Sequence, residues 1–462
     1  MSTTALVLAA GKGTRMKSER VKVLHRLCGR PMLEHMLDSI RQAGISKTYV
    51  VVGHQAEQVQ AEIAGDDLHW VLQAEQCGTG HAVRVALDQM TESGGTLLIL
   101  NGDAPLVRPS TLEKILKQHG STGAALTVLT AIFDDPFGYG RIVRDNAGRI
   151  TQSIEERDAS PEQKTIGEVN PGMYCFQLEQ LRQRIGELNS NNAQNEYYLP
   201  DLIGIFARHG LVVQTHPLED PGEMQGVNSR DELARVEKKI FRRIAEKWMR
   251  QGVTIHDPDS VYIEAPVTIG ADSEIHPSVI LQGATHIGSG CAIHSFSRLV
   301  DSVVEDGAVI HNSCVVTSSR VGPGTTVGPF AHLREHADVG ADARVGNFVE
   351  IKKSRLGDST KAAHLAYLGD AEIGKSVNIG AGTITCNYDG KQKHKTTIED
   401  DVFIGSDSQL IAPVHVGRGA YVAAGSSITQ DVPEYALGIA RGRQVNKPGW
   451  VKQKGLSKPK NS

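Results

Sequence analysis

The first part of the chain alternates short apolar runs with stretches in which apolar residues recur at helical spacing. The apolar runs are Ala5–Ala10, Tyr49–Val52, Leu97–Leu100 and Ala125–Leu129, and the helical stretches between them include Met32–Ala43 and Ser110–Gln118. This alternation is typical of an α/β domain whose sheet is mostly parallel. Because ligands of such domains bind where the parallel strands end, we expect a site at the carboxyl edge of this sheet.

A long amphipathic segment, Ser229–Arg250, follows the α/β part of the chain. Its apolar residues recur at helical spacing, and Glu232 stands three residues after Ser229, as in a capping box. Gly252 follows the last apolar residue, as is common where a helix ends. We predict that this segment is one helix, which links a domain of residues 1–228 to a domain of residues 251–462.

Beyond this helix the apolar period becomes six residues. The predicted inward positions form three series, Ile263 to Leu299, Val303 to Ile351 and Ile398 to Ile428, and the second series begins with Val303, Val309 and Val315 after a four-residue step. A hexapeptide repeat is typical of a parallel β-helix, in which one aliphatic residue of each repeat points into a narrow core. The pattern alone also fits a prism with a purely structural role.

The hexapeptide pattern breaks between Ile379 and Ile398. Residues 386–395 are polar and unsuited to the core, so we predict an external loop there. The loop carries the basic residues Lys391, Lys393, His394 and Lys395. Such a loop is either simply solvated or covers a neighbouring coil or chain.

Composition narrows the classes of function. The chain has 462 residues and a net charge of −4, so no overall positive field indicates a nucleic-acid partner. Its six cysteines are scattered without a C-x-x-C motif, which favours reduced thiols in a cytoplasmic protein. No segment resembles a signal peptide or a membrane span, so we expect no membrane partner.

The apolar run 5–7 leads directly into the loop LAAGKGTRM, residues 8–16. Gly11 and Gly13 allow the backbone to approach an anion, and Lys12 and Arg15 add positive charge. The loop is neither a Walker P-loop nor a G-x-G-x-x-G turn. By itself it fits either phosphate binding or an ordinary strand-to-helix turn.

Further motifs give a specific resemblance. The first half contains LAAGKGTRM, KVLHRLCGRPM, LQAEQCGTGHA, NGDAPL and GYGRI, and the second half contains VGNFVEIKKSRLG, HLAYLGDAEIG and NIGAGTITCNYDG. The first set resembles sugar nucleotidyltransferases, and the second resembles acyltransferases with a left-handed β-helix. Together they resemble the bacterial family that combines N-acetylglucosamine-1-phosphate uridylyltransferase and glucosamine-1-phosphate N-acetyltransferase activities.

The resemblance implies a Rossmann-like nucleotidyltransferase fold followed by a left-handed parallel β-helix. It implies acetyl transfer from acetyl-CoA to glucosamine 1-phosphate, and then uridylyl transfer from UTP to N-acetylglucosamine 1-phosphate. The product, UDP-N-acetylglucosamine, would feed peptidoglycan and lipopolysaccharide synthesis. Because family members are trimers with acetyltransferase sites between adjacent prisms, a homotrimer is expected, and the Lys-rich tail after Lys447 would either lack fixed structure or cap the trimer.

For the uridylyltransferase half, the resemblance assigns a role to each matching residue. The nucleotide would be bound by Leu8, Ala9, Ala10, Gly11, Arg15, Lys22, Gln73, Gly78 and Thr79. N-acetylglucosamine 1-phosphate would be bound by Gly140, Glu155, Asn170 and Asn228. Mg²⁺ would be held by Asp103 and Asn228, together with phosphate and water oxygens.

For the acetyltransferase half, the resemblance implies that His364 is the general base, Glu350 orients it, and Asn387 orients the thioester or its oxyanion. Glucosamine phosphate would be bound by Arg334, Lys352, Tyr367, Asn378 and Lys393. Acetyl-CoA would be bound by Ala381, Asn387, Tyr388, Ser406, Ala424, Arg441 and Lys447.

The position of His364 in the repeat supports this role. Steps of six from Ile351 reach Gly357 and Ala363, so we expect the aliphatic series to lapse beside His364 and to leave its ring free to face a cleft.

The chain departs from the family pattern in three places. Asn101 stands where the family has Tyr, Pro171 replaces Thr in Asn-Thr-Gly, and Glu335-His336 replaces Pro-Gly after Arg334. Two other functions remain open at this stage. One is a nucleotidyltransferase with a regulatory β-helix, and the other is a scaffold or exchange-factor subunit with the same pair of domains.

Overall fold

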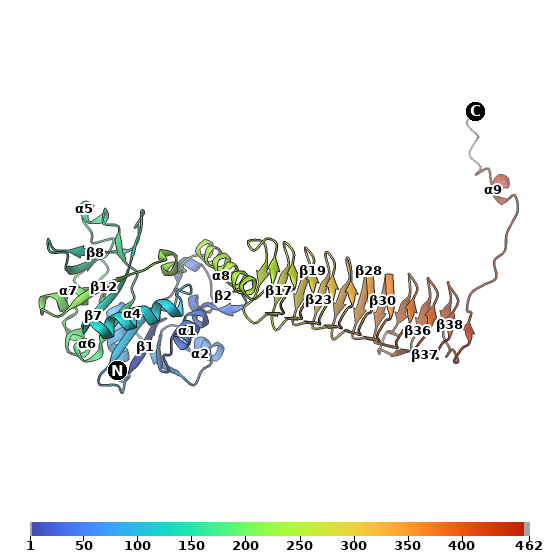
Figure 1. Ribbon diagram of the computed structural model, residues 1–462, viewed down its shortest axis with the longest axis horizontal. Coiled ribbons are helices and arrows are strands. Elements are labelled where there is room, and N and C mark those ends of the chain that lie inside the picture. The colour runs from blue at the N-terminus through green and yellow to red at the C-terminus, as the bar shows by residue number, and fades with distance from the viewer. Residues whose placement is uncertain (1, 457–462) are drawn as a thin grey trace, which may run out of the picture. The chain divides into compact units, whose positions relative to one another are not determined.

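The computed structural model describes residues 2–456, which form two compact units divided between Ile240 and Phe241. Figure 1 shows a sheet flanked by helices in the first unit and a stack of short strands in the second. The Lys-rich end of the chain, for which we expected either no fixed structure or a cap, lies partly outside the described residues. Among residues 2–456, no helix has the length and apolar character needed to cross a bilayer.

The first unit is built on a mixed sheet. Its strands, in spatial order, are β5 (Leu68–Leu72), β4 (Thr48–Val52), β1 (Thr3–Leu8), β6 (Thr96–Asn101), β11 (Tyr174–Gln177), β7 (Leu126–Ile132), β10 (Glu168–Asn170), β8 (Gly140–Arg144) and β9 (Ile150–Ile154). Strands β5, β4, β1 and β6 run parallel, whereas β11 pairs antiparallel with both β6 and β7. The strand β12 (Val213–Pro217) pairs parallel with β7.

Helices and short elements complete the first unit. The helices are α1 (Met32–Gln42), α2 (Ala56–Glu62), α3 (Thr79–Gln89), α4 (Pro109–Thr122), α5 (Pro161–Lys164), α6 (Leu178–Arg184) and α7 (Asp201–Arg208). The short 3₁₀ turns are Thr14–Met16, Lys22–Leu24, Ile185–Glu187 and Pro221–Met224, and β2 (Arg26–Leu27) pairs with β3 (Arg30–Pro31).

The parallel strands are buried on both faces of the sheet. In β1, Val7 belongs to one core with Val50 and Leu98, and Leu6 belongs to the opposite core with Val51. Burial on both faces explains why these strands appear in the sequence as continuous apolar runs rather than as alternating ones.

The predicted long helix is confirmed as α8 (Arg230–Arg250). The Ser229 hydroxyl accepts a hydrogen bond from the Glu232 backbone N–H at 3.4 Å, as expected for an N-cap. Gly252 has a φ of +90°, which residues with a Cβ atom rarely adopt, so glycine suits the end of this helix.

The second unit is a parallel β-helix whose strands stack coil upon coil. One face consists of β15 (Thr268–Ile269), β18 (His286–Ile287), β21 (Val303–Val304), β24 (Arg320–Val321), β27 (Asp338–Val339), β29 (Arg355–Leu356), β31 (Ala371–Ile373), β34 (Thr396–Ile398) and β37 (Val414–Val416). A second face consists of β13 (Thr254–Ile255), β16 (Glu274–Ile275), β19 (Ala292–Ile293), β22 (Val309–Ile310), β25 (Thr326–Val327), β32 (Asn378–Ile379), β35 (Phe403–Ile404), β38 (Tyr421–Val422) and β40 (Leu437–Gly438).

The third face consists of β14 (Tyr262–Ile263), β17 (Ile280–Gln282), β20 (Arg298–Val300), β23 (Val315–Thr317), β26 (His332–Arg334), β33 (Ile384–Cys386), β36 (Gln409–Ile411) and β39 (Ser427–Ile428). Two long strands, β28 (Arg344–Lys352) and β30 (Lys361–Gly369), pair with strands of both the second and the third face and so join them. A short helix, α9 (Trp450–Gln453), follows the last strand.

The predicted inward series is correct from Ile263 to Leu299 but wrong at the start of its second part. Val304, Ile310 and Val316 point into the core and are fully buried, whereas their neighbours Val303 and Val315 are 37% and 38% exposed. Val309, the second predicted member of this series, is half-buried. Two adjacent aliphatic residues occupy each of these strands, and neighbouring strand residues point to opposite sides, so the apolar pattern could not choose between them.

The step between coils explains the shift. Leu299 to Val304 and Ile351 to Leu356 are steps of five residues. After the second of these steps Ala362 and Leu368 continue the buried series, so the predicted lapse beside His364 is wrong. His364 instead lies in the exposed middle of the long strand β30.

The external loop predicted over 386–395 is confirmed, with Asn387 buried at its base and Tyr388 exposed. The expectation of unlinked cysteines also agrees with the structure, because the described residues contain all six cysteines and no disulfide.

We predict that Ile310→Ala lowers the free energy of unfolding by about 2–5 kcal/mol, because it leaves a cavity in the narrow core. The neighbouring variant Val309→Ala is the matched control and should change it by less than about 1 kcal/mol, since its side chain faces outward. Denaturation of the full chain, followed by circular dichroism, measures both effects. A larger loss for Val309→Ala than for Ile310→Ala would contradict the assigned register.

Candidate active sites

The opening loop curves over the carboxyl edge of the parallel strands. The Ala9 backbone N–H donates to the Val51 carbonyl at 2.8 Å, and the Ala10 carbonyl accepts from Gln76 Nε2 at 2.6 Å. Gly13 has a φ of +60°, and a Cβ atom there would lie 2.6 Å from the Cβ atom of Lys22. Glycine is therefore required at this turn, where it lets the Lys22 side chain pass close to the loop.

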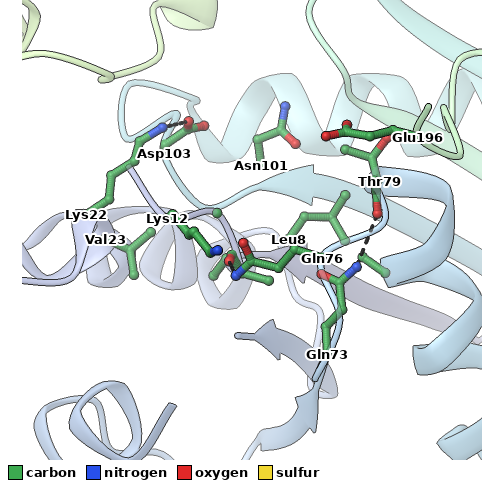
Figure 2. Close-up of a pocket in the computed structure, with 15 residues that line it drawn as sticks. Leu8, Lys12, Lys22, Val23, Gln73, Gln76, Thr79, Asn101, Asp103 and Glu196 are labelled. Atoms are coloured by element: carbon green, nitrogen blue, oxygen red, sulfur yellow. Dashed lines mark hydrogen bonds and ion pairs between the residues drawn. The ribbon is translucent and has the colours of Figure 1, made fainter. Parts of the chain in front are cut away.

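The loop forms one wall of a cavity of about 430 Å³. The cavity is lined by Leu8, Ala9, Ala10, Gly11, Lys12, Lys22, Val23, Gln73, Gln76, Gly78, Thr79, Ala82, Asn101, Asp103 and Glu196. Figure 2 shows Lys22 and Asp103 together at one side of this cavity, away from Gln73 and Thr79. The structure thus brings together all the predicted nucleotide-binding residues except Arg15, which is exposed on the turn Thr14–Met16.

The wall opposite Lys22 is held by a fixed hydrogen-bond arrangement. Gln73 is buried, and its Nε2 donates to the Gly78 carbonyl at 3.2 Å. A Cβ atom at Gly78 would lie 2.6 Å from the Tyr197 carbonyl oxygen, so glycine is required there. Thr79 begins α3, and its hydroxyl accepts from the Leu199 backbone N–H at 3.1 Å.

The two predicted metal ligands lie on either side of a lysine ammonium group. Lys22 Nζ contacts Asp103 Oδ2 and donates to Asn228 Oδ1 at 2.7 Å. The Asn228 backbone N–H in turn donates to Glu232 Oε2 at 2.6 Å, which fixes the start of α8 beside this site. Two oxygen atoms from separate parts of the chain therefore already surround a positive charge.

A second cavity of about 280 Å³ adjoins the first and shares Leu8, Thr79, Asn101 and Glu196 with it. It contains three of the predicted sugar-binding residues, Gly140, Glu155 and Asn170. Its position next to the larger cavity suits a ligand with two linked parts, one in each cavity.

Burial and charge repulsion raise the pKa of the Glu155 carboxyl in this second cavity. Burial is the larger cause, and the nearby carboxylates of Asp201 and Asp158 add to it. Asn170 is held rigidly, because its Nδ2 donates to Tyr174 OH at 2.9 Å and its Oδ1 accepts from the Gly172 N–H at 3.0 Å.

Two of the three departures from the family pattern touch each other. Asn101 Nδ2 donates to the Pro171 carbonyl at 3.1 Å. Gly172 has a φ of +85°, and a Cβ atom there would lie 2.6 Å from Asn101 Nδ2. The two substitutions thus form one local contact on the shared wall of the cavities.

Several polar cavity residues had no role assigned from the sequence. They include Gln76 in the first cavity, Gln194 and Tyr198 in the second, and Glu196 in both. The last three come from the loop before α7, which carries no glycine-rich or charged motif. The only available signal was its unusual density of amide, carboxylate and tyrosine side chains in NAQNEYYLP.

In the second unit, three cationic side chains gather on neighbouring coils. Arg334 and Lys352 are direct register partners on β26 and β28, and Lys352 lowers the pKa of the nearby Lys393. Arg334 donates to Glu350 Oε1 from Nε at 2.8 Å, and it also contacts Glu335. Glu335 Oε2 lies 3.4 Å from Lys352 Nζ. A carboxylate of this chain therefore lies where the predicted phosphate of the sugar would bind.

The imidazole of His364 has a different partner from the one we predicted. Its Nδ1 lies 2.9 Å from Asn347 Oδ1, on the register partner one coil away. Glu350 is occupied by Arg334 and lies in register with Tyr367. Asn347 is thus a positioning candidate that sequence reasoning missed, and the orienting role of Glu350 stays a prediction.

Three predicted acetyl-CoA residues form a column at one corner of the prism. Asp407 N–H donates to the Ala381 carbonyl at 2.7 Å, and Gly425 N–H donates to the Ser406 carbonyl at 2.8 Å. These bonds stack Ala381, Ser406 and the turn that contains Ala424 on successive coils.

The remaining predicted residues of this half lie in other places. Asn387 is buried and donates from Nδ2 to Asp370 Oδ2 at 2.5 Å, and Tyr388 OH donates to the Gly390 carbonyl at 2.8 Å. Asn378 pairs with Lys361 on a different face from Lys352. Arg441 and Lys447 are exposed beyond the last strand.

The fold and the two groups of residues define a two-part transferase, with a nucleotidyltransferase domain followed by a hexapeptide transferase domain. Residues 5–164 match the family model of the MobA-like NTP transferase domain. Residues 258–355 match the GMPPB C-terminal domain, and residues 395–430 match the bacterial transferase hexapeptide model.

Full-length relatives identify the family. The bifunctional protein GlmU of Trichlorobacter lovleyi is 52% identical over 453 residues, which cover 98% of each chain. The bifunctional protein GlmU of an Exiguobacterium species is 51% identical and covers 98% of this chain and 100% of the relative, and that of Shouchella clausii is 47% identical and covers 97% and 98%. The chain belongs to the family of the bifunctional protein GlmU.

Proposed function

We propose that the protein makes UDP-N-acetylglucosamine in two steps. It transfers the acetyl group of acetyl-CoA to glucosamine 1-phosphate, and it then transfers the uridylyl group of UTP to the N-acetylglucosamine 1-phosphate formed. The observation that carries this proposal is the match to bifunctional GlmU proteins over nearly the whole of both chains. The product supplies peptidoglycan and lipopolysaccharide synthesis, and the six cysteines without a disulfide in residues 2–456 suit the cytoplasm as its location.

In the uridylyl step, a phosphate oxygen of the sugar attacks the α-phosphorus of UTP, and pyrophosphate leaves. The larger cavity takes the nucleotide, with Gln73 and Gly78 at the uracil and Lys22 at the phosphates. The adjoining cavity takes the sugar beside Asn170 and Glu155. Catalysis here consists of holding the reactants in line and offsetting negative charge.

We assign the metal site to Asp103 and Asn228, with Mg²⁺ as the cation. The chemistry fits, because both residues offer oxygen and because the ammonium group of Lys22 already lies between them. Mg²⁺ held there would neutralise phosphate charge, and Lys22 would be free to bind a phosphate oxygen itself.

In the acetyl step, the amine of the sugar attacks the thioester carbonyl, and the thiol of CoA leaves. His364 takes the proton from the amine at a ring nitrogen, while Asn347 holds Nδ1. Arg334, Lys352 and Lys393 bind the phosphate of the sugar, and Asn387 orients the thioester. The column at Ala381, Ser406 and Ala424 lines the acetyl-CoA site.

Each of the two alternative functions predicts that one of the sites has lost residues that it needs. A nucleotidyltransferase with a regulatory β-helix would have lost Lys352, His364 or Lys393, and the chain retains all three. A scaffold or exchange-factor subunit would lack Asp103 or an intact opening loop, and the chain has both.

One assay with two matched variants tests the proposal. The full chain is incubated with glucosamine 1-phosphate, acetyl-CoA, UTP and Mg²⁺, and both transfer rates are measured. Asp103→Ala should abolish uridylyl transfer and leave acetyl transfer intact. His364→Ala should lower the kcat of acetyl transfer by roughly 10²–10⁴-fold, the usual effect of losing a general base, and leave uridylyl transfer intact. If either variant folds but loses both activities, the two reactions do not take place at two separate sites.

Glu335 provides a second test, because its carboxylate competes with the phosphate of the sugar for Arg334 and Lys352. Glu335→Gln should lower the KM for glucosamine 1-phosphate by about twofold to fivefold, as expected for removing a partly exposed ion pair. Glu372→Gln, which removes a carboxylate paired with Lys395 at 2.5 Å, is the control. A KM that rises in Glu335→Gln would mean that Glu335 positions Arg334 rather than opposing the substrate.

We further propose a homotrimer assembled through the β-helices. Exposed apolar residues form a stripe along one corner of the prism, with Phe330, Phe348 and Leu365 on successive coils and Phe296 two coils before Phe330. The Phe348 N–H donates to the Phe330 carbonyl, and the two rings stack with centroids 5.4 Å apart. Such a stripe of large apolar side chains favours burial against another surface.

One chain has a mass of 49.8 kDa, and light scattering at micromolar concentration should give three times this value. The double variant Phe330→Ser and Phe348→Ser should weaken the trimer, because it removes the two stacked rings. A monomer for the unmodified protein would contradict this proposal.

A further inference from the structure

Four histidines stand one above another on the first coils of the β-helix. Each follows the buried isoleucine of its strand, at His256, His276, His294 and His311. The register pairs Ile255 with Ile275, Ile275 with Ile293 and Ile293 with Ile310. Parallel pairing therefore places the four imidazoles in one column, spaced by the distance between neighbouring strands.

The rings are in contact along this column. The centroids of His256 and His276 are 4.6 Å apart, those of His276 and His294 are 4.4 Å apart, and those of His294 and His311 are 5.4 Å apart. The last two pairs are stacked, with interplanar angles of 22° and 28°. Stacking on His294 restricts the ring of His276 and fixes the side to which its Nε2 points.

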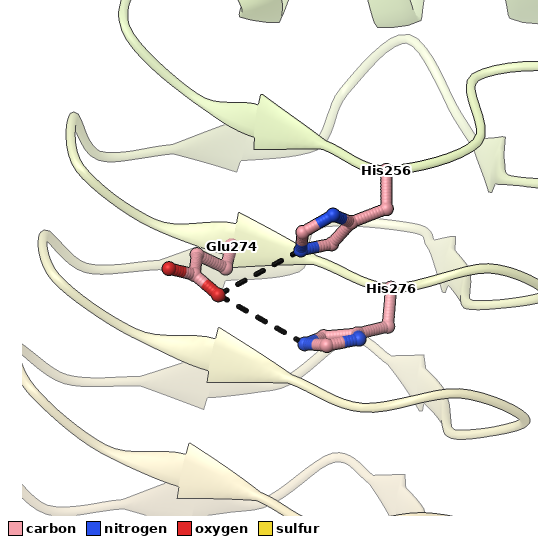
Figure 3. Close-up of side chains that lie close together, drawn as sticks. All are labelled: His256, Glu274 and His276. Atoms are coloured by element: carbon pink, nitrogen blue, oxygen red, sulfur yellow. Dashed lines mark ion pairs between the residues drawn. The ribbon is translucent and has the colours of Figure 1, made fainter.

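A carboxylate completes a set of three ligand atoms at the top of the column. Glu274 Oε2 lies 3.7 Å from His256 Nε2 and 4.0 Å from His276 Nε2. All three atoms lie within 4.8 Å of one another. Figure 3 shows both ring nitrogens directed at the same carboxylate oxygen. These separations are too long for hydrogen bonds, so a space remains between the three atoms.

We propose that His256, Glu274 and His276 bind a divalent transition-metal cation of the zinc class. Two imidazole nitrogens and one carboxylate oxygen are donors that Zn²⁺, Co²⁺ and Ni²⁺ prefer, whereas Mg²⁺ prefers oxygen alone. This site is separate from the oxygen site at Asp103 in both composition and domain, and it does not depend on the proposed function.

The required adjustment is small. Ligand atoms about 2.0–2.2 Å from a tetrahedral zinc ion lie about 3.4 Å apart. The two separations from Glu274 Oε2, 3.7 and 4.0 Å, must therefore shorten by about 0.3 and 0.6 Å, and the two ring nitrogens, which lie within 4.8 Å of each other, must approach by at most about 1.4 Å. The side chains of His256 and Glu274 are 43% and 54% exposed, so these two have room to move toward the more restricted ring of His276, which is 27% exposed. Water would occupy the remaining coordination position.

A cation at this place links two coils. His256 directly follows β13, Glu274 begins β16 and His276 directly follows it, and β16 pairs with β13. The strands β13 and β16 belong to the first coils of the β-helix, directly after α8. In the described chain no earlier coil pairs with β13. Binding would therefore hold the terminal coil against the next one.

Cobalt provides the direct test, because its visible absorption bands report the ligands and their geometry. The full chain, freed of metals with a chelator and kept in excess Mg²⁺, is titrated with Co²⁺ and then with Zn²⁺. The variants are His276→Ala and the conservative Glu274→Gln. The control is His286→Ala, which removes an exposed histidine from a different face of the same coils.

We expect one tightly bound Co²⁺ per chain, without the near-ultraviolet absorption of a thiolate ligand, and displacement by Zn²⁺. Both His276→Ala and Glu274→Gln should weaken binding by at least roughly tenfold, since even changes outside the ligand set commonly do so. His286→Ala should bind as the unmodified protein does. Binding that is absent in the unmodified protein, or unchanged in either ligand variant, would overturn the proposal.

Stability gives an independent readout. Zn²⁺ should raise the melting temperature of the unmodified protein and of His286→Ala, because a ligand that binds only the folded state stabilises it. It should not raise that of Glu274→Gln, a variant that keeps the size of the side chain. Equal shifts in all three proteins would show that zinc acts elsewhere and would also overturn the proposal.

Discussion

The backbone pairing between successive coils determines where every outward side chain of the β-helix lies. Each residue stands directly above its register partner, so a chemical group at one position of the repeat becomes a column when it recurs. Arg334 with Lys352, Phe330 with Phe348, and the histidines from His256 to His311 are three columns formed in this way. The buried aliphatic residues maintain the register, and the exposed columns bring like side chains together on the surface.

The first unit uses a different constraint. Its parallel strands end along one edge, and loops from distant parts of the chain converge there. The ammonium group of Lys22 links two of them, because it lies between Asp103 after β6 and Asn228 before α8. Two oxygens from separate loops thus face a positive charge before any ligand binds.

Sequence patterns predicted the features that depend on periodicity or on a required residue type. The period of six, the N-cap at Ser229 and the strand before the opening loop belong to this group. The sequence predicted that Val303 points inward, whereas Val304 does. Both residues are valines, and only the length of the preceding turn decides which one is buried. Asn347 and Glu196 were missed because each reaches its site through register or loop folding rather than through a motif. The histidine column, in contrast, is visible as four Ile-His pairs, at 255–256, 275–276, 293–294 and 310–311.

The same geometry connects the acetyl-transfer proposal with the trimer. The third face of the prism holds Arg334 and Lys352, and His364 lies in the strand β30, which joins the second and third faces. Asn378 lies on the second face, and Arg441 follows the last strand. A substrate pair that includes both a sugar phosphate and acetyl-CoA must contact residues from more than one of these surfaces. The core of one rigid prism holds residues of different faces and different coils at fixed separations. If all the assigned residues act in one site, some of them must come from a neighbouring chain, and the apolar stripe at Phe330 and Phe348 provides a surface through which that neighbour can pack.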